Sequence, residues 1–464
     1  MQKIDILLIR PNSGIPIQPA PLGLGYLAAV LKKDNINVDI KDSLIDNMSI
    51  EKTVCFIKEH CIKIVGISCC SDELPWVQEL VRNIKSALDV KIIVGGPHPS
   101  SVLEEIYTDI NGIDFSIYSE GEIAISSLAR AILQNNLKPE RLNAIPNLIW
   151  KNGGKIVKNR QKFIENLDDI DFPSWDLINP KKYSARIPHG FMYKAYPFAP
   201  MVATRGCPYS CSFCATNKIH GNKLRIRSVD NIIREIKYLS VEYGIKEFFF
   251  EDDNFTFNEN FVKEFCMKII GSNLGVFFSL PNGICADRIN EEMLVLMRKA
   301  NFYSFSVGVE SGSQRILERM RKKTNLEMVK NKISLAKKYG FYITGFFIMG
   351  YPDETREDIM LTIKYAREIN IDKAVFNKYL PLPGTESYNS LVNKGEIKRQ
   401  QYFEGVTIKD IPYSPEGISR DELRDYIRKA IILFYLRPSI ILKNIFRIKC
   451  NQLMSLYTIF KRFS

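Results

Sequence analysis

The strongest constraint on the fold of this chain is an alternation of short apolar segments with amphipathic helices, which occurs twice along the sequence. In the first run, the predicted strands span residues 4–9, 38–40, 64–68, 92–94 and 115–118, with helices such as 22–33 and 74–88 between them. Short strands rich in Ile and Val are expected where both faces of a sheet are covered. This run predicts a doubly wound parallel sheet, which would bind a ligand beyond the carboxyl ends of its strands.

The second run begins near residue 200 and predicts six further strands. They span residues 201–204, 247–250, 276–280, 304–309, 343–348 and 374–379, and the helices between them span 229–243, 259–270, 291–300, 326–339 and 355–369. Ser228 is the expected N-cap of the first of these helices. Six strand–helix units fit a partial (βα)6 barrel, whose active site would lie at the carboxyl ends of the strands. The predicted fold class is therefore α/β, with a flavodoxin-like or Rossmann-like sheet, a partial TIM-type barrel and a helical C-terminal region.

Three of the ten cysteines lie together after the first strand of the second run. Cys207, Cys211 and Cys214 have the spacing C-x3-C-x2-C. A loop this tight can turn three thiolates toward one iron–sulfur cluster and leave one iron open as a reactive centre. A zinc site would need a fourth ligand, for which His220 is the nearby candidate, and a disulfide would leave one cysteine unpaired. The other seven cysteines are scattered among apolar residues and are expected to be buried free thiols of a reducing cytosol (Cys55, Cys61, Cys69, Cys70, Cys266, Cys285, Cys450).

The C-x3-C-x2-C spacing, with Phe213 before the last cysteine, resembles the signature of the radical S-adenosylmethionine (SAM) superfamily. The resemblance implies that the three cysteines bind a [4Fe–4S] cluster whose free iron is chelated by SAM. It also implies that an electron from the cluster cleaves SAM to a 5′-deoxyadenosyl radical, which abstracts hydrogen from the substrate. Motifs at later strand ends resemble the SAM-binding elements of that family, and the residues expected to contact SAM are Phe213, Asp252, Glu310, Ser311, Ile348 and Gly350.

Two alternatives stay open for the charged residues of these motifs. Carboxylates such as Asp252 could instead cap the following helix. One of the basic residues 321–323 is a candidate partner of the SAM carboxylate, and a solvated helix end explains them equally well.

The turns of the first run resemble the cobalamin-binding domain that precedes many radical SAM domains. On that resemblance, the residues expected at the cobalamin site are Asn12, Leu22, Gly23, Ser68, Gly95, Gly96, His98, Glu120 and Gly121. The D-x-H-x-x-G pattern that supplies a lower axial histidine is absent, so His98 is expected to contact the corrin edge or nucleotide tail and not the cobalt. The alternatives are a turn histidine with no ligand and, for the whole domain, a flavodoxin-like fold with another ligand or none.

Together these resemblances imply a cobalamin-dependent radical SAM enzyme that uses a [4Fe–4S] cluster, SAM and cobalamin. Residues 434–438 are similar to the branch that contains carbon and phosphorus methyltransferases and the anaerobic magnesium-protoporphyrin ester cyclase. The expected reaction is methyl transfer from methylcobalamin to an unactivated carbon or phosphorus centre. The alternatives are a cobalamin-using oxidative cyclase or rearranging enzyme, and a non-catalytic cobalamin or redox sensor. No general base or radical-quenching residue is assigned.

A chain of 464 residues is too long for one ordinary core, so several domains are expected. Their predicted bounds are 1–140 for the cobalamin-binding domain, 141–196 for a linker or subdomain, 197–390 for the radical SAM domain and 391–464 for the helical region. The expected partners are a small-molecule substrate, lipid-like or a natural-product intermediate, and a low-potential electron donor such as flavodoxin or ferredoxin. No nucleic-acid module is recognised, although the net charge is +12.

The C-terminal segment carries half of that charge excess. Residues 431–464 contain six basic residues and no acidic one, and a basic amphipathic helix is predicted from residue 440 to 463. It is expected to cover a substrate cavity or the protein's own flank, with contact to the inner face of the membrane as the alternative. Neither a signal peptide nor an apolar span of about 18 residues is found, so a cytoplasmic location is predicted.

Overall fold

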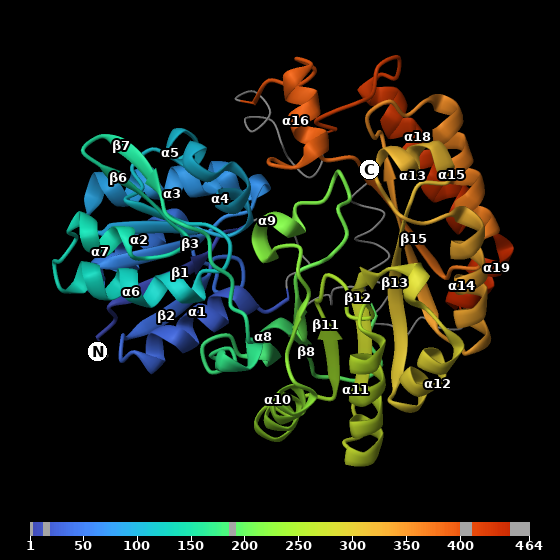
Figure 1. Cartoon of the computed structure of the whole chain (residues 1–464), viewed down its shortest axis with the longest axis horizontal. Coiled ribbons are helices and arrows are strands. Elements are labelled where there is room, and N and C mark those ends of the chain that lie inside the picture. Colours follow the sequence, from blue (N-terminus) through green and yellow to red (C-terminus); the bar gives the residue numbers. More distant parts are fainter. Residues whose placement is uncertain (1–2, 13–18, 185–191, 400–410, 446–464) are drawn as a thin grey trace.

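The structure, a computed structural model, describes residues 3–12, 19–184, 192–399 and 411–445, the side chains of residues 442–445 excepted. Two parallel sheets lie side by side, the first in the N-terminal part of the chain and the second in the C-terminal part (Figure 1). Helices flank both sheets in the same view. The predicted α/β class with two successive parallel sheets is confirmed.

The first sheet has seven strands in the order β2-β1-β3-β4-β5-β6-β7. Its first five strands are parallel: β1 (Ile6–Arg10), β2 (Val38–Asp42), β3 (Ile64–Ser68), β4 (Lys91–Gly95) and β5 (Phe115–Ile117). The five predicted strands are all present, and they are doubly wound. The helices are α1 (Leu22–Lys33), α2 (Ile50–Glu59), α3 (Leu74–Ala87), α4 (Pro97–Val102), α5 (Ile106–Asp109), α6 (Glu122–Leu133) and α7 (Pro139–Asn143).

Both faces of this sheet are covered, as the apolar strands predicted. Along β1, Ile6 and Leu8 pack into one hydrophobic core while Leu7 and Ile9 pack into another. Successive side chains of a strand point to opposite faces. A strand between two helical layers therefore needs an apolar residue at every position.

The first sheet continues beyond the strands that the sequence predicts for it. Strands β6 (Leu148–Asn152) and β7 (Lys155–Lys158) form an antiparallel hairpin, and β6 pairs with β5. The stretch predicted as a linker from residue 141 thus begins as part of the first sheet. Its later part includes α8 (Pro180–Ser184), which packs against β8.

The second sheet has six parallel strands in the order β8-β11-β12-β13-β14-β15. They are β8 (Phe198–Met201), β11 (Glu247–Phe250), β12 (Phe277–Ile284), β13 (Phe302–Glu310), β14 (Tyr342–Met349) and β15 (Lys373–Lys378). Among the described residues β8 and β15 do not pair with each other, so the sheet is an open, partial barrel. The helices are α10 (Val229–Glu242), α11 (Glu259–Ser272), α12 (Glu291–Lys299), α13 (Gln314–Arg319), α14 (Leu326–Lys338) and α15 (Arg356–Glu368). Ser228 caps α10 as predicted, since its hydroxyl accepts from the Asn231 amide at 3.2 Å.

The first strand of this sheet lies three residues earlier than predicted. It contains Pro200, which the prediction placed before the strand. Proline is tolerated on an edge strand because one side of that strand makes no ladder hydrogen bonds. After β8 the chain forms the short strand β9 (Thr204–Arg205), which pairs with β10 (Arg225–Ile226) in a separate antiparallel ladder. Helix α9 (Thr216–His220) lies between β9 and β10.

The C-terminal elements are α16 (Glu386–Asn393), α18 (Arg420–Tyr435) and α19 (Pro438–Ile445). Helix α18 packs on β15 and α15, and the Tyr435 hydroxyl donates to the Ala374 carbonyl at 2.9 Å. Most of the predicted basic helix lies outside the described residues. Within the described ranges, length and hydropathy together identify no candidate for a membrane-spanning helix.

Candidate functional site

A cavity of about 510 Å³ lies between the carboxyl ends of the first sheet and the start of the barrel. Seven of the nine residues predicted at the cobalamin site line it: Leu22, Gly23, Ser68, Gly95, Gly96, Glu120 and Gly121. The opposite wall comes from the barrel and includes Thr204, Arg205, Ile219 and His220. One space therefore joins the turns of the first domain to the chain on both sides of the three cysteines.

The cavity fits a large ligand with apolar faces. Most of its lining is apolar side chains and glycine. A Cβ atom added to Gly23 would meet no atom within 4 Å, so the glycine leaves room that a side chain would take. Ligands of doubly wound sheets bind at this edge. The residues present are thus compatible with cobalamin.

The remaining two predicted residues, Asn12 and His98, do not line the cavity. His98 is fully buried, with Nδ1 3.0 Å from the Ser71 hydroxyl and Nε2 3.2 Å from a carboxylate oxygen of Asp109. Both ring nitrogens face protein groups. This arrangement fits the alternative prediction, in which His98 is a turn histidine that contacts no ligand. Asn12 is exposed.

The three clustered cysteines lie on a loop of residues 206–224, here called the cysteine loop, which the β9–β10 pair closes at its neck. Gly206 starts this loop with a φ of 90°, a backbone conformation that side-chain-bearing residues rarely adopt. A Cβ added there would overlap the carbonyl oxygen of Lys223. The neck is thus closed so tightly that glycine is required just before Cys207.

The middle of the cysteine loop is held by neutral hydrogen bonds from the barrel. The Ser212 amide donates to the Met320 carbonyl at 3.0 Å, and the Ser212 carbonyl accepts from the amide of Ser387 on α16, also at 3.0 Å. The Ser212 hydroxyl lies 2.8 Å from the Tyr351 hydroxyl. These contacts fix the backbone between Cys211 and Cys214.

The three thiols fit a cluster better than a single ion. Cys207 and Cys211 are half-buried and Cys214 is exposed; like the other described cysteines, they are unpaired. Across the described ranges no three His, Cys, Asp or Glu side chains converge as one metal ion requires. A cubane cluster takes each cysteine at a different iron, so its ligands need not converge on one point.

Burial raises the pKa of Cys207 and Cys211 to about 11, and the nearby Cys214 thiol adds to the rise in both. Metal ligation requires the thiolate, so binding of a cluster here is coupled to loss of protons.

Opposite charges meet at the carboxyl end of β13. Glu310 has a φ of 65°, and its carboxylate lies 2.8 Å from the Lys322 ammonium group. Burial alone would lower the pKa of Lys322, but Glu310 more than offsets this and the pKa is raised. Among the basic residues 321–323, Lys322 is therefore the one placed at the site; the sequence left this choice open.

The side chains of Asp252 and Ser311 contact protein groups. The carboxylate of Asp252 accepts from the backbone amides of Ala203 and Thr204, which hold the turn that enters the cysteine loop. Burial raises the pKa of this carboxyl group to about 7. Ser311 is fully buried, and its hydroxyl lies 3.1 Å from the Thr362 hydroxyl.

The predicted SAM contacts Ile348 and Gly350 lie in different surroundings. Ile348 and Phe213 are both partly buried and pack against the same hydrophobic core. At Gly350, which has a φ of 84°, an added Cβ would overlap Leu423 of α18. The close approach at this glycine is thus to the C-terminal helix.

The scattered cysteines are less uniform than predicted. Cys69 and Cys266 are buried, Cys70 and Cys285 are half-buried, and Cys55 and Cys61 are exposed. On α2 the buried face consists of Ile50, Thr53 and Ile57, so Cys55 points away from it. Cys450 lies outside the described residues.

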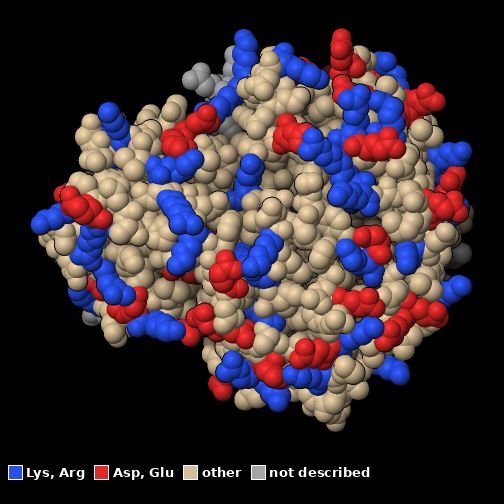
Figure 2. All heavy atoms as spheres, viewed as in Figure 1, with Lys and Arg blue, Asp and Glu red and all other residues tan. Residues whose placement is uncertain are grey.

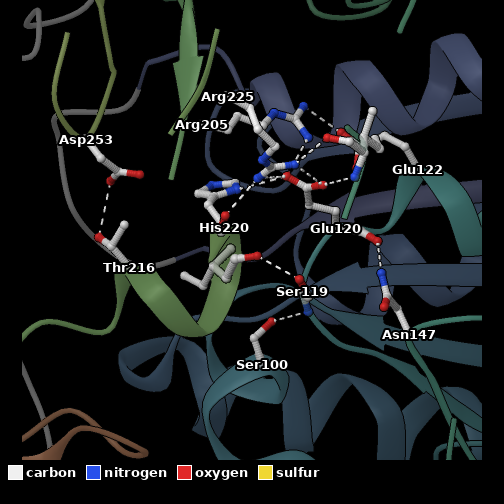
Figure 3. Close-up of polar contacts among 12 residues, drawn as sticks. Ser100, Ser119, Glu120, Glu122, Asn147, Arg205, Thr216, His220, Arg225 and Asp253 are labelled. Carbon is white, nitrogen blue, oxygen red and sulfur yellow. Dashed lines mark hydrogen bonds and ion pairs between the residues drawn. The ribbon is translucent and has the colours of Figure 1, made fainter. Parts of the chain in front are cut away.

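A buried polar network at the neck of the cysteine loop was not predicted (Figure 3). Arg225 donates to Glu120 and Arg205 donates to Glu122, each pair joining the barrel to the first domain. The prediction assigned Glu120 to the ligand and did not assign Arg205 or Arg225. The available signal was an arginine on each side of the three-cysteine loop, because arginines that become buried require carboxylate partners.

Family models match both parts of the chain. The model described as the radical SAM superfamily matches residues 201–366, and the one described as the B12 binding domain matches residues 16–129. These ranges contain the cysteine loop and most of the first sheet.

Curated relatives cover nearly the whole chain. An uncharacterized methyltransferase of Pyrococcus horikoshii is 30% identical over 96% of this chain and 95% of its own length. Cytidylyl-2-hydroxyethylphosphonate methyltransferase of Streptomyces wedmorensis is 28% identical over 87% of this chain and 84% of its own length. The anaerobic magnesium-protoporphyrin IX monomethyl ester cyclase of Rubrivivax gelatinosus is 28% identical over 94% of this chain and 78% of its own length.

Among solved structures, the radical SAM methyltransferase TsrM from Kitasatospora setae, with cobalamin and a [4Fe–4S] cluster bound, has a similar fold. The TM-score is 0.69 at 16% identity, over 85% of this chain and 75% of that chain. At this identity the likeness supports the two-domain fold alone.

Proposed function

This chain belongs to the radical SAM enzymes that carry a B12-binding domain, and from that premise we propose that it transfers a methyl group from cobalamin to an unactivated carbon or phosphorus centre. The resemblances read from its motifs are thereby confirmed for both domains. With them come the cofactors of the family: the [4Fe–4S] cluster, SAM and cobalamin. The methyl transfer is supported by the names of relatives such as the phosphonate methyltransferase.

The observation that carries the proposal is the shared cavity. Its walls come from the predicted cobalamin turns on one side and, on the other, from Arg205, just before the cysteine loop, and His220, within it. An enzyme that moves a group between two cofactors and a substrate needs them in one space from which water is excluded. The mostly apolar walls of this cavity provide such a space.

The residues of the chain have separate tasks in this reaction. Cys207, Cys211 and Cys214 would hold the cluster, and the residues that line the cavity would hold cobalamin. When bound, the cluster supplies the electron that cleaves SAM, and cobalamin carries the methyl group. Lys322 can neutralise a ligand carboxylate, and Glu310 can accept hydrogen bonds from ligand hydroxyl groups.

The acceptor is proposed to be a small molecule, lipid-like or a natural-product intermediate, because the cavity walls are mostly apolar. A flavodoxin or ferredoxin is the proposed electron donor. On the face shown in Figure 2, acidic and basic side chains are intermingled, which does not resemble the one-signed surface of a nucleic-acid-binding protein.

Membrane contact through residues 446–464 stays a prediction, since they lie outside the described ranges. Sedimentation with anionic phospholipid vesicles, with and without residues 446–464, tests it. Binding that disappears on truncation supports the contact, and absence of binding by the full chain contradicts it.

The direct test of the reaction is anaerobic reconstitution of the full chain with iron, sulfide and hydroxocobalamin, followed by SAM and dithionite. Mass spectrometry then measures 5′-deoxyadenosine, S-adenosylhomocysteine and methylated cobalamin. We expect all three from the wild type and from the control Cys266→Ala, which removes a buried thiol outside the cysteine loop. No 5′-deoxyadenosine is expected from Cys211→Ala.

The second candidate function is an oxidative cyclisation or rearrangement without methyl transfer. It has less support than methyl transfer and rests on the cyclase relative. 5′-Deoxyadenosine together with unmethylated cobalamin would favour it. Protein with a full complement of iron that releases no 5′-deoxyadenosine would contradict radical chemistry altogether.

A further inference from the structure

One carboxylate of the first domain lies at the centre of the contacts that hold the neck of the cysteine loop. Glu120 follows β5, and its side chain has no exposed surface. Nη1 and Nη2 of Arg225 each donate to it at 2.8 Å, so the pair is bidentate. Nη1 of Arg205 and Nδ1 of His220 each lie 3.5 Å from Oε1 of Glu120 (Figure 3). Glu120 thus contacts the chain on both sides of the three cysteines.

Two neighbours of Glu120 in the same turn also contact the chain before and after the three cysteines. A carboxylate oxygen of Glu122 accepts from Arg205 at 2.7 Å. The Ser119 hydroxyl donates to the Ile219 carbonyl at 2.8 Å. Residues 119–122 therefore attach the first domain to the residue two positions before Cys207 and to the end of α9.

The same turn also forms part of the cavity wall. Ser119, Glu120, Gly121 and Glu122 all line the cavity, together with Arg205. A short segment thus faces the cobalamin cavity on one side and the cysteine loop on the other. These contacts join the two sites directly, in addition to the apolar core that residues of both sheets share.

The ionic network at the neck fixes the relative position of its groups more than it raises the free energy of unfolding. Two carboxylates and two guanidinium groups balance within the network, so each buried charge has a partner. Taking charges out of water costs about as much as pairing them returns, so such pairs stabilise little more than apolar side chains of the same volume would. A bidentate arginine–carboxylate pair does, however, fix both distance and orientation.

We propose that Glu120 is a positioning residue, which sets the cysteine loop at a fixed place against the cobalamin cavity through Arg225 and Arg205. It touches neither the cluster nor the reacting atoms in this role. The proposal rests on the two-cofactor chemistry of the proposed function. Because Glu120 also lines the cavity, the proposal concerns protein in which both cofactors are already bound: transfer between them depends on this carboxylate.

The test uses the full chain reconstituted with both cofactors, and the variant Glu120→Gln, which removes the charge and keeps the shape. Glu235→Gln is the matched control, because Glu235 is a buried carboxylate 2.7 Å from Arg227 and accepts from Trp175 at 2.9 Å, and both partners lie outside the cysteine loop. Iron and cobalamin contents are measured first. Electron paramagnetic resonance then reports the magnetic interaction between the reduced cluster and cob(II)alamin, which depends steeply on their separation.

In samples matched for iron and cobalamin content, we expect Glu120→Gln to show a changed magnetic interaction. Its rate of cobalamin methylation by SAM should fall by about tenfold or more, because small misplacements of reacting groups are costly. The control should change neither quantity. An unchanged interaction in Glu120→Gln, or an equal change in Glu235→Gln, overturns the proposal.

If Glu120→Gln does not fold, Arg225→Lys replaces it, since that variant keeps the charge and loses the bidentate geometry. The same change in the magnetic interaction is then expected, and its absence counts against the proposal. If the wild type never methylates cobalamin, the proposed methyl transfer fails, but the magnetic interaction still decides the role of Glu120.

Discussion

The cysteine loop is held at its neck and at its middle by two different kinds of contact. At the neck, Glu120 and Glu122 of the first domain pair with Arg225 and Arg205 in a buried ionic network. At the middle, Ser212 makes neutral hydrogen bonds to groups of the barrel itself. Neutral contacts thus hold the middle of the loop, whereas the attachment of its neck to Glu120 and Glu122 relies on charges that tolerate little displacement.

The largest effect is expected at the neck. Replacing Glu120 by Ala leaves Arg225 and Arg205 buried without their shared partner. Breaking a buried pair from one side costs about 3–5 kcal/mol, so the free energy of unfolding should fall by that amount. Urea unfolding of the apo-protein, followed through tryptophan fluorescence, to which the buried Trp150 and Trp175 contribute, measures it. A loss under about 1 kcal/mol would show that the neck is no stronger than the middle.

The next effect is expected at Gly206, where the neck closes. Gly206→Ala places a side chain on a backbone with a φ of 90° and against the Lys223 carbonyl. A strained conformation of this kind costs about 1–3 kcal/mol, and we expect lower iron content after reconstitution. Gly244→Ala is the control, because Gly244 has a φ of 64° and open space around it. Equal iron contents in the two variants would contradict a tight neck.

Acid should weaken the neck before it weakens the middle. Burial alone would raise the pKa of Glu120, but the hydrogen bonds from His220 and Arg225 and the charge of Arg205 hold it well below its usual value. A depressed folded-state pKa contributes stability above the unfolded-state pKa of about 4.3 and loses it as the pH falls further.

The measurement for this prediction is the midpoint of urea unfolding of the apo-protein between pH 7 and pH 3. The midpoint should fall below about pH 4.3 more steeply in the wild type than in Glu120→Gln. Parallel curves for the two proteins would mean that Glu120 does not contribute to the acid response.

The smallest effect is expected at the middle of the loop. Ser212→Ala removes the hydroxyl contacts to Tyr351 and to the Arg319 carbonyl but keeps both backbone hydrogen bonds of residue 212. A neutral hydrogen bond contributes about 1 kcal/mol, so a small loss of stability and a normal iron content are expected. Iron loss as large as that of Gly206→Ala would place the decisive contact at the middle and reverse the comparison.

Local patterns were sufficient to predict most of the fold. Helix α1 and strands β3 and β11 have the predicted bounds, because apolar spacing and flanking turns are encoded within a few residues. The prediction placed strand β8 too late in the sequence because proline usually breaks a strand. Proline is tolerated here because β8 lies at the edge of the sheet, which the sequence does not reveal.

The site was predictable only where its residues are adjacent in sequence. The spacing of the three cysteines, Cys207, Cys211 and Cys214, is enough to identify them. Arg225, the partner of Glu120, lies 105 residues further along the chain. The same limit applies to Asp252. Its motif predicts a contact with SAM, but its carboxylate accepts hydrogen bonds from backbone amides 48 and 49 residues earlier in the chain. Long-range pairing of charges depends on how the two sheets pack against each other, and no local pattern encodes it.

The 105-residue separation of Glu120 and Arg225 also orders the events of biosynthesis. Domains generally fold as units, with the N-terminal one first as the chain leaves the ribosome. The first sheet is therefore complete while Glu120 still faces water and the barrel has not been translated. During that interval residues 119–122 form only one wall of the future cavity. Arg205 and His220 add the opposite wall when the barrel docks, so the cavity exists only after both domains have folded.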